Sequence, residues 1–509
     1  MTRDDFVAQL LDCAKQFWPP YFGQLADEDR LRLAGIEAEL RGVTQQFVQG
    51  LWQWVAVHLA RLGEKTARNC DCGRRRERQK CPIEIDVLGV KVTFDCPYYY
   101  CRHCKQGESP VRRWLGKEAG GVSLQLERAL TDLTSRLTFG DTVSTLMEQH
   151  GQEMERTKAE RVTYRVGDEA LQYLDERRRK ALEALGQEGR TTGVDQLETT
   201  ADGGGIPVGE LQRPSKEDVT PETELTPVRK LPRGQRPIQA REARLVVAHE
   251  AGVVTERVVD CHIAPYEQTE FTGERMLATA AEAGLGDNTH VHGVFDMGAW
   301  IKGQFEEQFA MHERTAVADI MHVTEYLTDA GRVVVGTEGA KSWAMERKGR
   351  LLSGEADAVI EELDEHRCGG SCLKDEHGKC LVRVAHRYLS RNRAYLNYPE
   401  ILALELPVGS GEAESGIRHI IKKRMDVAGA WKEENAIRLL ALITIRASGW
   451  WDDFWLWREK RDVASWWKRQ RGEVKPVFRG HRGTRQNDKT ETAPPVATAN
   501  SATPLVASA

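Results

Sequence analysis

Three acidic residues in this chain stand in settings that suit metal-dependent chemistry on phosphate. Asp202 and Asp296 each end a run of residues typical of a β-strand, and Glu414 follows a Gly-Ser-Gly turn at the expected start of a helix. Three converging carboxylates can hold two divalent metal ions, which together bind the attacking and the leaving oxygen of a phosphodiester. We therefore expect these three residues to form a two-Mg²⁺ site that cuts nucleic acid.

The residues next to Asp202 favour a site over a chance position. Three glycines, at 203–205, follow it directly, and glycine lets another backbone or a substrate approach closely. The alternative is that this aspartate, like Asp296, only caps a strand or a turn, which is the usual role of an aspartate at a strand end.

The helix expected after the Gly-Ser-Gly turn also points to a site. Glu414, Ile417 and Ile421 share one face of it at 3.6-residue spacing, so the glutamate should face the body of the domain. Arg418 and Arg424 lie near that face and could contact phosphate.

The elements that would position these carboxylates form an α/β region with a helical insertion. Hydrophobic periodicity predicts strands near 194–201, 205–211, 243–249, 253–263 and 290–296, and helices near 270–284 and from 299. Residues 310–400 are expected to be mostly helical, with a long helix near 340–366. The 118 residues that separate Asp296 from Glu414 exceed one crossover, which indicates inserted helices.

A cysteine-rich segment precedes this region. Six of the eleven cysteines fall between residues 70 and 104, and in a cytosolic chain this favours metal binding over disulfides. A β-hairpin is expected at 83–87 and 90–94, and tetrahedral thiolate ligation of zinc would stabilise so small a module. The candidate ligands are Cys70, Cys72, Cys101 and Cys104, with Cys81 and Cys96 as alternatives.

A second group of possible metal ligands lies in the helical region. It consists of His366, Cys368, Cys372, His377 and Cys380. Its Cys-x₃-Cys spacing is less usual for zinc, so a loop with free thiols is the alternative.

Several basic segments could contact DNA. A short helix near 142–150, a turn and a helix near 155–168 resemble a helix-turn-helix, with an ordinary helical hairpin as the alternative. Its basic residues are Arg156, Lys158, Arg161 and Arg165. Residues 61–80 carry a net charge of +5, and residues 456–488 are also basic. The tryptophans between 450 and 467 could stack on bases or pack in a helical core.

Whole-chain properties indicate a cytoplasmic protein. The formal net charge of −5 does not by itself indicate a nucleic-acid partner. No run of apolar residues is long enough to span a membrane, and the N-terminus lacks the apolar segment of a signal peptide. We therefore expect no membrane partner, a cytoplasmic location and, in a cell without a nucleus, association with the nucleoid.

An ordered set of short motifs links the carboxylates to a known family. The motifs are Ala201-Asp202-Gly203; Asp296-Met297-Gly298-Ala299-Trp300-Ile301; Asp319-Ile320-Met321-His322 with Glu325-Tyr326-Leu327; Tyr388-Leu389-Ser390-Arg391-Asn392-Arg393 with Tyr398; Gly409-Ser410-Gly411 with Glu414; Arg424; Gly429-Ala430-Trp431; and Trp451-Asp452-Asp453-Phe454-Trp455. In these motifs, over roughly residues 66–458, the chain resembles bacterial insertion-sequence transposases of the DDE class, of the ISKra type. Two departures are Met297, where the family usually has glycine, and the one-residue spacer between Cys70 and Cys72.

The resemblance implies an RNase H-like mixed-sheet core that brings Asp202, Asp296 and Glu414 together over two Mg²⁺ ions. The chemistry implied is hydrolysis at the ends of a mobile element, then strand transfer into target DNA. Trp300 would pack or orient near the site. Asp319 and His322, three residues apart on one helix, would form a structural pair or contact DNA.

Residue patterns and the resemblance together give the expected order of the modules, and the resemblance implies the partners. The expected regions are an N-terminal helical region at 1–65, a zinc-ribbon-like module at 66–115, a helix-turn-helix-like region at 116–188, the first part of the core at 189–310, a helical insertion at 311–408, the last part of the core with Trp-rich helices at 409–470, and a disordered tail at 471–509. The partners would be double-stranded DNA, as terminal inverted repeats and target, and further copies of the chain in a dimer or larger assembly. The alternatives are an RNase H-like nuclease without strand transfer and a catalytically inactive DNA-binding protein.

Overall fold

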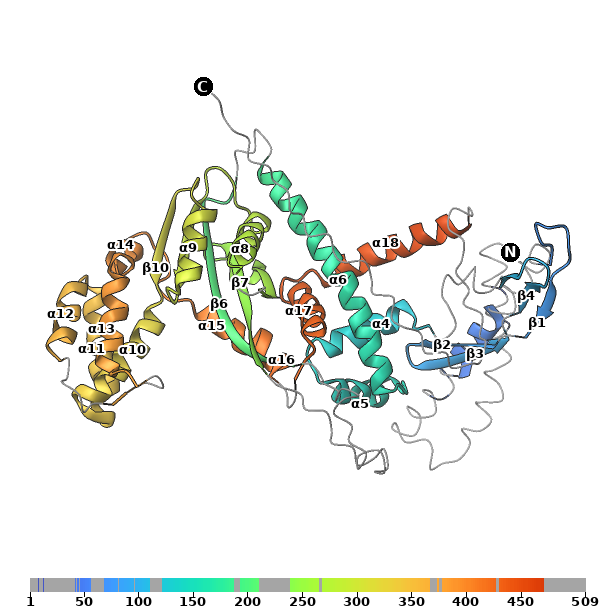
Figure 1. The fold of residues 1–509 in the computed structure, drawn as a ribbon, viewed down its shortest axis with the longest axis horizontal. Helices are drawn as coiled ribbons and strands as arrows, with labels where there is room; N and C mark the ends of the chain where they lie inside the picture. Colours follow the sequence, from blue (N-terminus) through green and yellow to red (C-terminus); the bar gives the residue numbers. More distant parts are fainter. Residues whose placement is uncertain are drawn as a thin grey trace, which may run out of the picture.

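The computed structural model has an elongated shape, with a helical region at one end, a sheet at the centre and small antiparallel strands at the other end (Figure 1). The structure describes residues 8, 12, 42, 44, 46–55, 68–80, 82–95, 97–109, 121–186, 193–209, 239–264, 268–366, 373–374, 378–426 and 430–470. Residues 46–55, within the expected N-terminal helical region, are helical. The rest of that region is largely, and the expected tail at 471–509 wholly, outside the described residues.

The centre of the molecule is a five-stranded mixed sheet. Its strands are β6 (Gln196–Val208), β7 (Gln239–Glu250), β8 (Val258–Ile263), β9 (His290–Phe295) and β10 (Arg314–Ala318). The order across the sheet is β8-β7-β6-β9-β10. β7 is antiparallel to both of its neighbours, whereas β6, β9 and β10 are parallel to one another. Every residue of β8 and nearly every residue of β9 is buried, as expected for a sheet covered on both faces.

Alternation along β6 and β7 directs side chains into two separate hydrophobic cores. Leu197 and Val246 belong to the first core, which the sheet forms with the helices that follow β8, β9 and β10. Ile206 and Leu245 belong to the second core, which the sheet forms with helices that precede β6 and helices near the C-terminal end of the described residues. Asp202 has the same parity as Ile206, so it lies on the face of the sheet that contributes to this second core.

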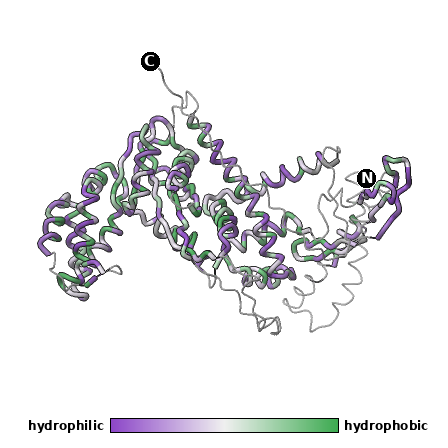
Figure 2. The backbone as a smooth tube through the Cα atoms, in the orientation of Figure 1, coloured by the Kyte–Doolittle hydropathy of each residue, from purple (hydrophilic) through white to green (hydrophobic). Residues whose placement is uncertain are grey.

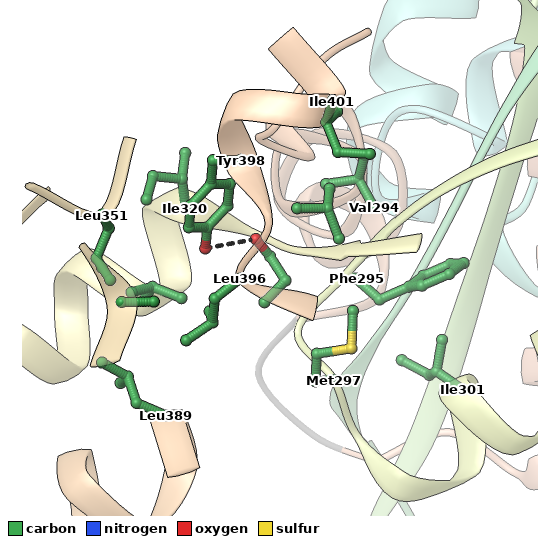
Figure 3. Packing of buried hydrophobic residues seen from close by; sticks show 14 of the residues in the cluster. Val294, Phe295, Met297, Ile301, Ile320, Leu351, Leu389, Leu396, Tyr398 and Ile401 are labelled. Atoms are coloured by element: carbon green, nitrogen blue, oxygen red, sulfur yellow. Dashed lines mark hydrogen bonds between the residues drawn. The ribbon is translucent and has the colours of Figure 1, made fainter. Parts of the chain in front are cut away.

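The first core extends without interruption from the sheet into a helical insertion. The helices that contribute to this core are α8 (Glu270–Glu282), α9 (Ala299–Gln308), α10 (Ile320–Val334), α11 (Gly336–Leu352), α12 (Ala356–Glu365), α13 (Leu381–Arg391) and α14 (Tyr398–Ala403). The insertion consists of the helices from α10 onward. Figure 3 shows residues of the insertion, among them Leu389 and Tyr398, packed in one cluster with Val294 and Phe295 of β9. The Tyr398 hydroxyl donates a hydrogen bond of 3.0 Å to the carbonyl oxygen of Ala318, at the end of β10.

The second core joins helices that lie far apart in the sequence. They are α4 (Leu124–Thr134), α5 (Phe139–His150), α6 (Arg156–Leu185), the π-helical turn η6 (Ile417–Lys422), α16 (Lys423–Met425), α17 (Glu433–Ala447) and α18 (Trp451–Gln470); α15 (Gly411–Gly416) directly precedes η6. The expected helix, turn and helix at 142–168 is present, with Gly151 ending α5 in the left-handed conformation. The outer ends of α6 and α18 project from the body and are largely hydrophilic (Figure 2).

The tryptophans of this region pack mainly in the core. Phe454 and Trp455 of α18 are buried, and Trp457 lies edge-on to Tyr173 of α6. Among those whose side chains are described, Trp467 is the most exposed, at 51%.

Small antiparallel strands form the other end of the molecule. They are β1 (Glu77–Gln79), β2 (Pro82–Val87), β3 (Val90–Asp95), β4 (Tyr98–Cys101) and β5 (Gln106–Glu108). β2 and β3 form the expected hairpin, with Gly89 of the two-residue turn at a φ of +78°. β1, β4 and β5 form a separate three-stranded sheet that carries two of the four candidate cysteine ligands at the end of β4 and in the following turn.

The structure corrects four expected elements. β6 is one continuous strand through the three glycines, not two strands. Residues 253–257 contain the 3₁₀-helix η4 (Val254–Glu256), and β8 begins only at Val258. β10 lies inside the region expected to be a helical insertion, so the insertion begins at Ile320 and not at 311. The long helix expected near 340–366 is two helices, because Gly354 between them has a φ of +91°.

Candidate carboxylate site and cysteine metal centre

Asp202 lies in the middle of β6, on the central strand of the sheet. The N–H group of Gly203 donates to its Oδ1 atom at 2.6 Å, which orients the carboxylate. The next glycine has a packing role, because a Cβ atom on Gly204 would lie 2.7 Å from the Cγ2 atom of Ile417. The glycine run therefore lets the helical segment after Glu414 lie directly on the strand that carries Asp202.

Asp296 is the first residue after β9, as the sequence predicted. The last paired residues of β6 and β9 are Thr200 and Val294, so Asp202 and Asp296 are each two residues beyond that pair on neighbouring parallel strands. Such strands lie about 4.8 Å apart, and residues two positions apart along a strand point to the same face. The Gly298 N–H group donates to Oδ1 of Asp296 at 2.9 Å.

Met297 stands where the transposases that the sequence resembles usually have glycine. Its φ is +60°, in the left-handed region where glycine is the usual residue. Its side chain is nonetheless buried in the first core, beside Phe295 and Ile301 (Figure 3). The position therefore has the backbone conformation of a glycine but contributes hydrophobic packing through methionine.

The backbone of Glu414 lies in α15, which packs on β6 and β7. Gly416 of α15 leaves no room for a Cβ atom against Leu245 of β7. The Glu414 side chain lies outside the described residues, so the structure places this residue by its helix alone. Among the described side chains, the one group of three or more His, Cys, Asp and Glu residues close enough to share a metal ion is the cysteine cluster.

Asp319 connects the insertion to the turn before α15. It is buried, its Oδ1 atom accepts the Met321 N–H group at 2.7 Å, and its Oδ2 atom accepts the hydroxyl of Ser410. These contacts give Asp319 a structural role at the start of α10. His322 contacts the rings of Tyr326 and Tyr388 instead of Asp319.

Two tyrosines of the insertion lie beside Asp296 and were given no role from the sequence. The rings of Tyr326 and Tyr388 stack with centroids 4.2 Å apart, and the Tyr388 hydroxyl donates to the carbonyl oxygen of Asp296 at 3.0 Å. Burial, with Tyr398 and Asp296 nearby, raises the pKa of Tyr388 far above its ordinary value, so this phenol stays protonated and remains a donor.

Trp300 lies on α9, close to the first strands. The guanidinium carbon of Arg244 is 3.9 Å from the centroid of its ring. Arg244 is opposite Gly203 in the β6–β7 pairing, and its Nη1 atom donates to the Thr272 hydroxyl at 2.8 Å. Trp300 therefore packs against the strand next to Asp202 through a cation–π contact.

The basic residues of α6 divide into two groups. Lys158 forms an ion pair with the buried Asp86 of β2, and Arg165 donates to the buried Glu127 of α4 at 2.6 Å. Their charges stabilise contacts between elements of the fold. Arg156 and Arg161 are exposed, and Arg156 pairs with Glu160 one turn along the same helix at 3.0 Å. The buried face of α6 packs on α17, so this helix is a central structural element.

Of the two arginines after Glu414, Arg418 is exposed and Arg424 is buried. Arg418 is exposed on η6. Arg424 is 3% exposed, donates to the Thr134 carbonyl oxygen at 2.6 Å and lies over the rings of Phe139 and Trp431. Burial lowers the pKa of the Arg424 guanidinium to about 10. This arginine therefore links α16 to the α4–α5 connection, a position that the sequence did not predict.

Four cysteines come together as the sequence predicted. The Sγ atoms of Cys70, Cys72, Cys101 and Cys104 lie within 4.8 Å of one another. Two of the distances are 3.9 Å, from Cys70 to Cys104, and 3.7 Å, from Cys72 to Cys101. Zinc bound tetrahedrally at 2.3 Å from each sulfur needs about 3.8 Å between sulfurs. The cluster can therefore hold a metal ion such as zinc.

The first two cysteines lie in a tight turn over residues 70–74. The Cys70 N–H group donates to the Arg74 carbonyl, and Gly73 adopts a φ of +79°. A hydrogen bond from the backbone of Cys72 lowers the pKa of the Cys70 thiol to about 7, which favours the thiolate that a metal requires. The alternative ligands Cys81 and Cys96 lie outside the described residues, as do three members of the second proposed cluster: Cys368, Cys372 and His377.

No protein-family model and no curated protein sequence matches this chain. In the part of the chain that the structure describes, none of the helices combines the length and apolar composition of a membrane span.

Proposed function

We propose that this protein is a DNA transposase of the DDE class that cuts and joins DNA at an RNase H-like core. The main support for the proposal is the position of Asp202 and Asp296, each two residues beyond the last residue pair of two neighbouring parallel strands. In addition, the helical segment that carries Glu414 packs on the strand of Asp202. The antiparallel β7 and the parallel β6, β9 and β10 support an RNase H-like arrangement of the sheet.

The three acidic residues would hold two Mg²⁺ ions. Bound there, the ions would activate a water or a DNA 3′-hydroxyl and stabilise the leaving oxygen. The N–H groups of Gly203 and Gly298 orient the carboxylates of Asp202 and Asp296 before any ligand arrives. Tyr388, neutral and bonded to the Asp296 carbonyl, would support the backbone at this position.

The other modules would bind the ends of the element. Zinc at the four cysteines would stabilise the small three-stranded sheet. The exposed basic residues Arg156, Arg161 and Arg418 would contact phosphates, since salt-dependent phosphate contacts supply most non-specific affinity for DNA. Because two DNA ends must be processed together, we expect a dimer or larger assembly of the chain.

The decisive experiment measures nicking and joining of DNA that carries the ends of the encoding element, with Mg²⁺ or Mn²⁺. The test variants are Asp202→Asn, Asp296→Asn and Glu414→Gln, and Asp329→Asn on the exposed side of α10 is the matched control. The proposal predicts that the wild type and the control cut and join, while the three test variants bind DNA without cutting it.

Three other outcomes would overturn parts of the proposal. Cleavage by the test variants at the wild-type rate would remove the carboxylates from the mechanism. Cleavage without joining of a 3′-OH donor would indicate an RNase H-like nuclease. Metal-independent DNA binding without any cleavage would indicate an inactive DNA-binding protein.

A further inference from the structure

A buried histidine lies between the central sheet and the helix of Glu414. His249 is near the end of β7 and is 4% exposed. Its Nε2 atom is 2.8 Å from Oε2 of Glu412 on α15, and its Nδ1 atom is 2.8 Å from the carbonyl oxygen of Glu250. A carboxylate and a carbonyl both accept hydrogen bonds, so both ring nitrogens must donate. This geometry requires the imidazolium form.

The charges around His249 agree with this form. The carboxylate of Glu198, which is paired directly with His249 on the neighbouring strand β6, is 3.7 Å away. Arg257 faces Glu412 from the other side, with 3.9 Å between its Nη1 atom and Oε1 of the glutamate. Burial would lower the pKa of His249, but the hydrogen bonds to Glu412 and Glu250 and the two nearby carboxylates raise it overall.

The helix held by this contact would be only marginally stable alone. α15 continues directly into η6 and α16, so the helical segment ends at Met425, and isolated helices of about 12–15 residues are marginal in water. Its position therefore depends on tertiary contacts. Ser410 holds the preceding turn to Asp319, Gly416 packs on Leu245, and Glu412 pairs with His249 between them. Glu412 is two residues before Glu414, so this ion pair is the polar contact nearest to the proposed metal ligand among those found for α15.

We propose that His249 is a positioning residue: it holds Glu412 and so fixes the α15 backbone that carries Glu414. This inference rests on the proposed function, because it assigns the contact a role in the metal site. Residues that orient metal ligands from outside the coordination sphere typically change metal affinity by about 10–100-fold when they are mutated.

The test measures Mn²⁺ affinity of the full chain by the loss of the free Mn²⁺ EPR signal. His249→Asn keeps a donor for the Glu250 carbonyl but cannot reach Glu412, and Glu412→Gln removes the charge of the partner. We expect each variant to weaken Mn²⁺ binding roughly tenfold, with unchanged DNA binding in the absence of metal. The double variant should be no weaker than either single variant, because both changes break one contact. His249→Gln, whose longer side chain can still donate to Glu412, should restore part of the affinity.

The matched control is His262→Asn. His262 is a buried histidine on the adjacent strand β8, and its ring nitrogens bond to Asp260 and Thr272 instead of to a residue of α15. It should lower the melting temperature and leave Mn²⁺ affinity unchanged. If His249→Asn behaves like this control, or if the effects of His249→Asn and Glu412→Gln simply add, His249 has no positioning role.

Glu414→Gln separates this inference from the proposed function. If Glu414→Gln binds Mn²⁺ as tightly as the wild type, the carboxylate site itself is refuted, and the inference fails with it. If Glu414→Gln weakens Mn²⁺ binding while His249→Asn does not, the carboxylate site stands and only the positioning role is refuted.

Discussion

At the scale of single residues, Met297 combines two opposing effects. Its φ of +60° costs roughly 1–2 kcal/mol for a residue with a Cβ atom, whereas burial of its side chain is stabilising. Met297→Ala should therefore lower the free energy of unfolding by about 2–5 kcal/mol, because it keeps the strain and loses the packing. Met297→Gly should be less destabilising than Met297→Ala by roughly 1 kcal/mol, the reverse of the usual order. Urea denaturation of both variants measures the difference, and a glycine variant less stable than the alanine variant would contradict the strain.

His292 provides a prediction for pH. Its Nε2 atom is 2.8 Å from the Pro407 carbonyl oxygen and its Nδ1 atom is 2.8 Å from the Thr315 hydroxyl, which suits the neutral ring. Burial lowers its pKa to about 4 from the ordinary 6.5. The unfolded chain therefore binds this proton at a higher pH than the folded chain does. Stability is fully present above pH 6.5 and is lost as pH falls towards 4, by up to about 3 kcal/mol.

The comparison of wild type with His292→Gln tests this assignment. The variant should be less stable at pH 7.5, and its stability should fall less steeply between pH 6.5 and pH 4. Parallel pH profiles of the two proteins would show that another group is responsible.

At the scale of secondary-structure elements, a buried carboxylate joins three helices. Glu127 of α4 is 1% exposed and accepts hydrogen bonds from Arg165 of α6 at 2.6 Å and Arg458 of α18 at 2.9 Å. Removing one partner of a buried ion pair typically costs 3–5 kcal/mol, so we expect Glu127→Gln to destabilise the protein by about 3 kcal/mol. Arg156→Gln breaks an exposed pair on α6 and should cost less than about 0.5 kcal/mol. Equal melting temperatures of the two variants would contradict this difference.

The strands that carry the cysteines should depend on metal. We expect purified protein to contain one zinc per chain, and a strong chelator or Cys101→Ser to abolish hydrogen-exchange protection of β1, β4 and β5. The central sheet has its own cores and should keep its protection. Unchanged protection of β4 after complete removal of metal would show that this module folds without it.

At the scale of the whole molecule, the insertion and the sheet share one hydrophobic core. Leu389 of α13 is fully buried in the same cluster as Val294 of β9 and Leu197 of β6. Leu389→Ala should cost about 2–5 kcal/mol, and hydrogen exchange should become faster in β9 as well as in the insertion. Matched substitution at Leu402, which is 45% exposed on α14, should have little effect. Faster exchange confined to the insertion would show two independent folding units.

Local patterns in the sequence were sufficient for several features. Hydrophobic patterning predicted β9 with an aspartate at its end and the β2–β3 hairpin, and close cysteine spacing predicted the four-thiol cluster. Each depends on residues that are near one another in the chain or on one side chain of distinctive chemistry. β10 was missed because its five residues are too few to show a clear period, and β6 was divided because three glycines usually interrupt a strand.

Only the tertiary structure decided how the charged residues are used. A lysine or arginine has the same appearance in a sequence whether it faces solvent or a buried acid. Lys158, Arg165 and Arg424 were predicted to contact DNA, yet the first two pair with Asp86 and Glu127 and the third is buried over aromatic rings. His249 received no role because its partner Glu412 is distant in the chain. Local sequence determines which strands and turns form, whereas partners far apart in the chain meet only when the sheet and helices have packed.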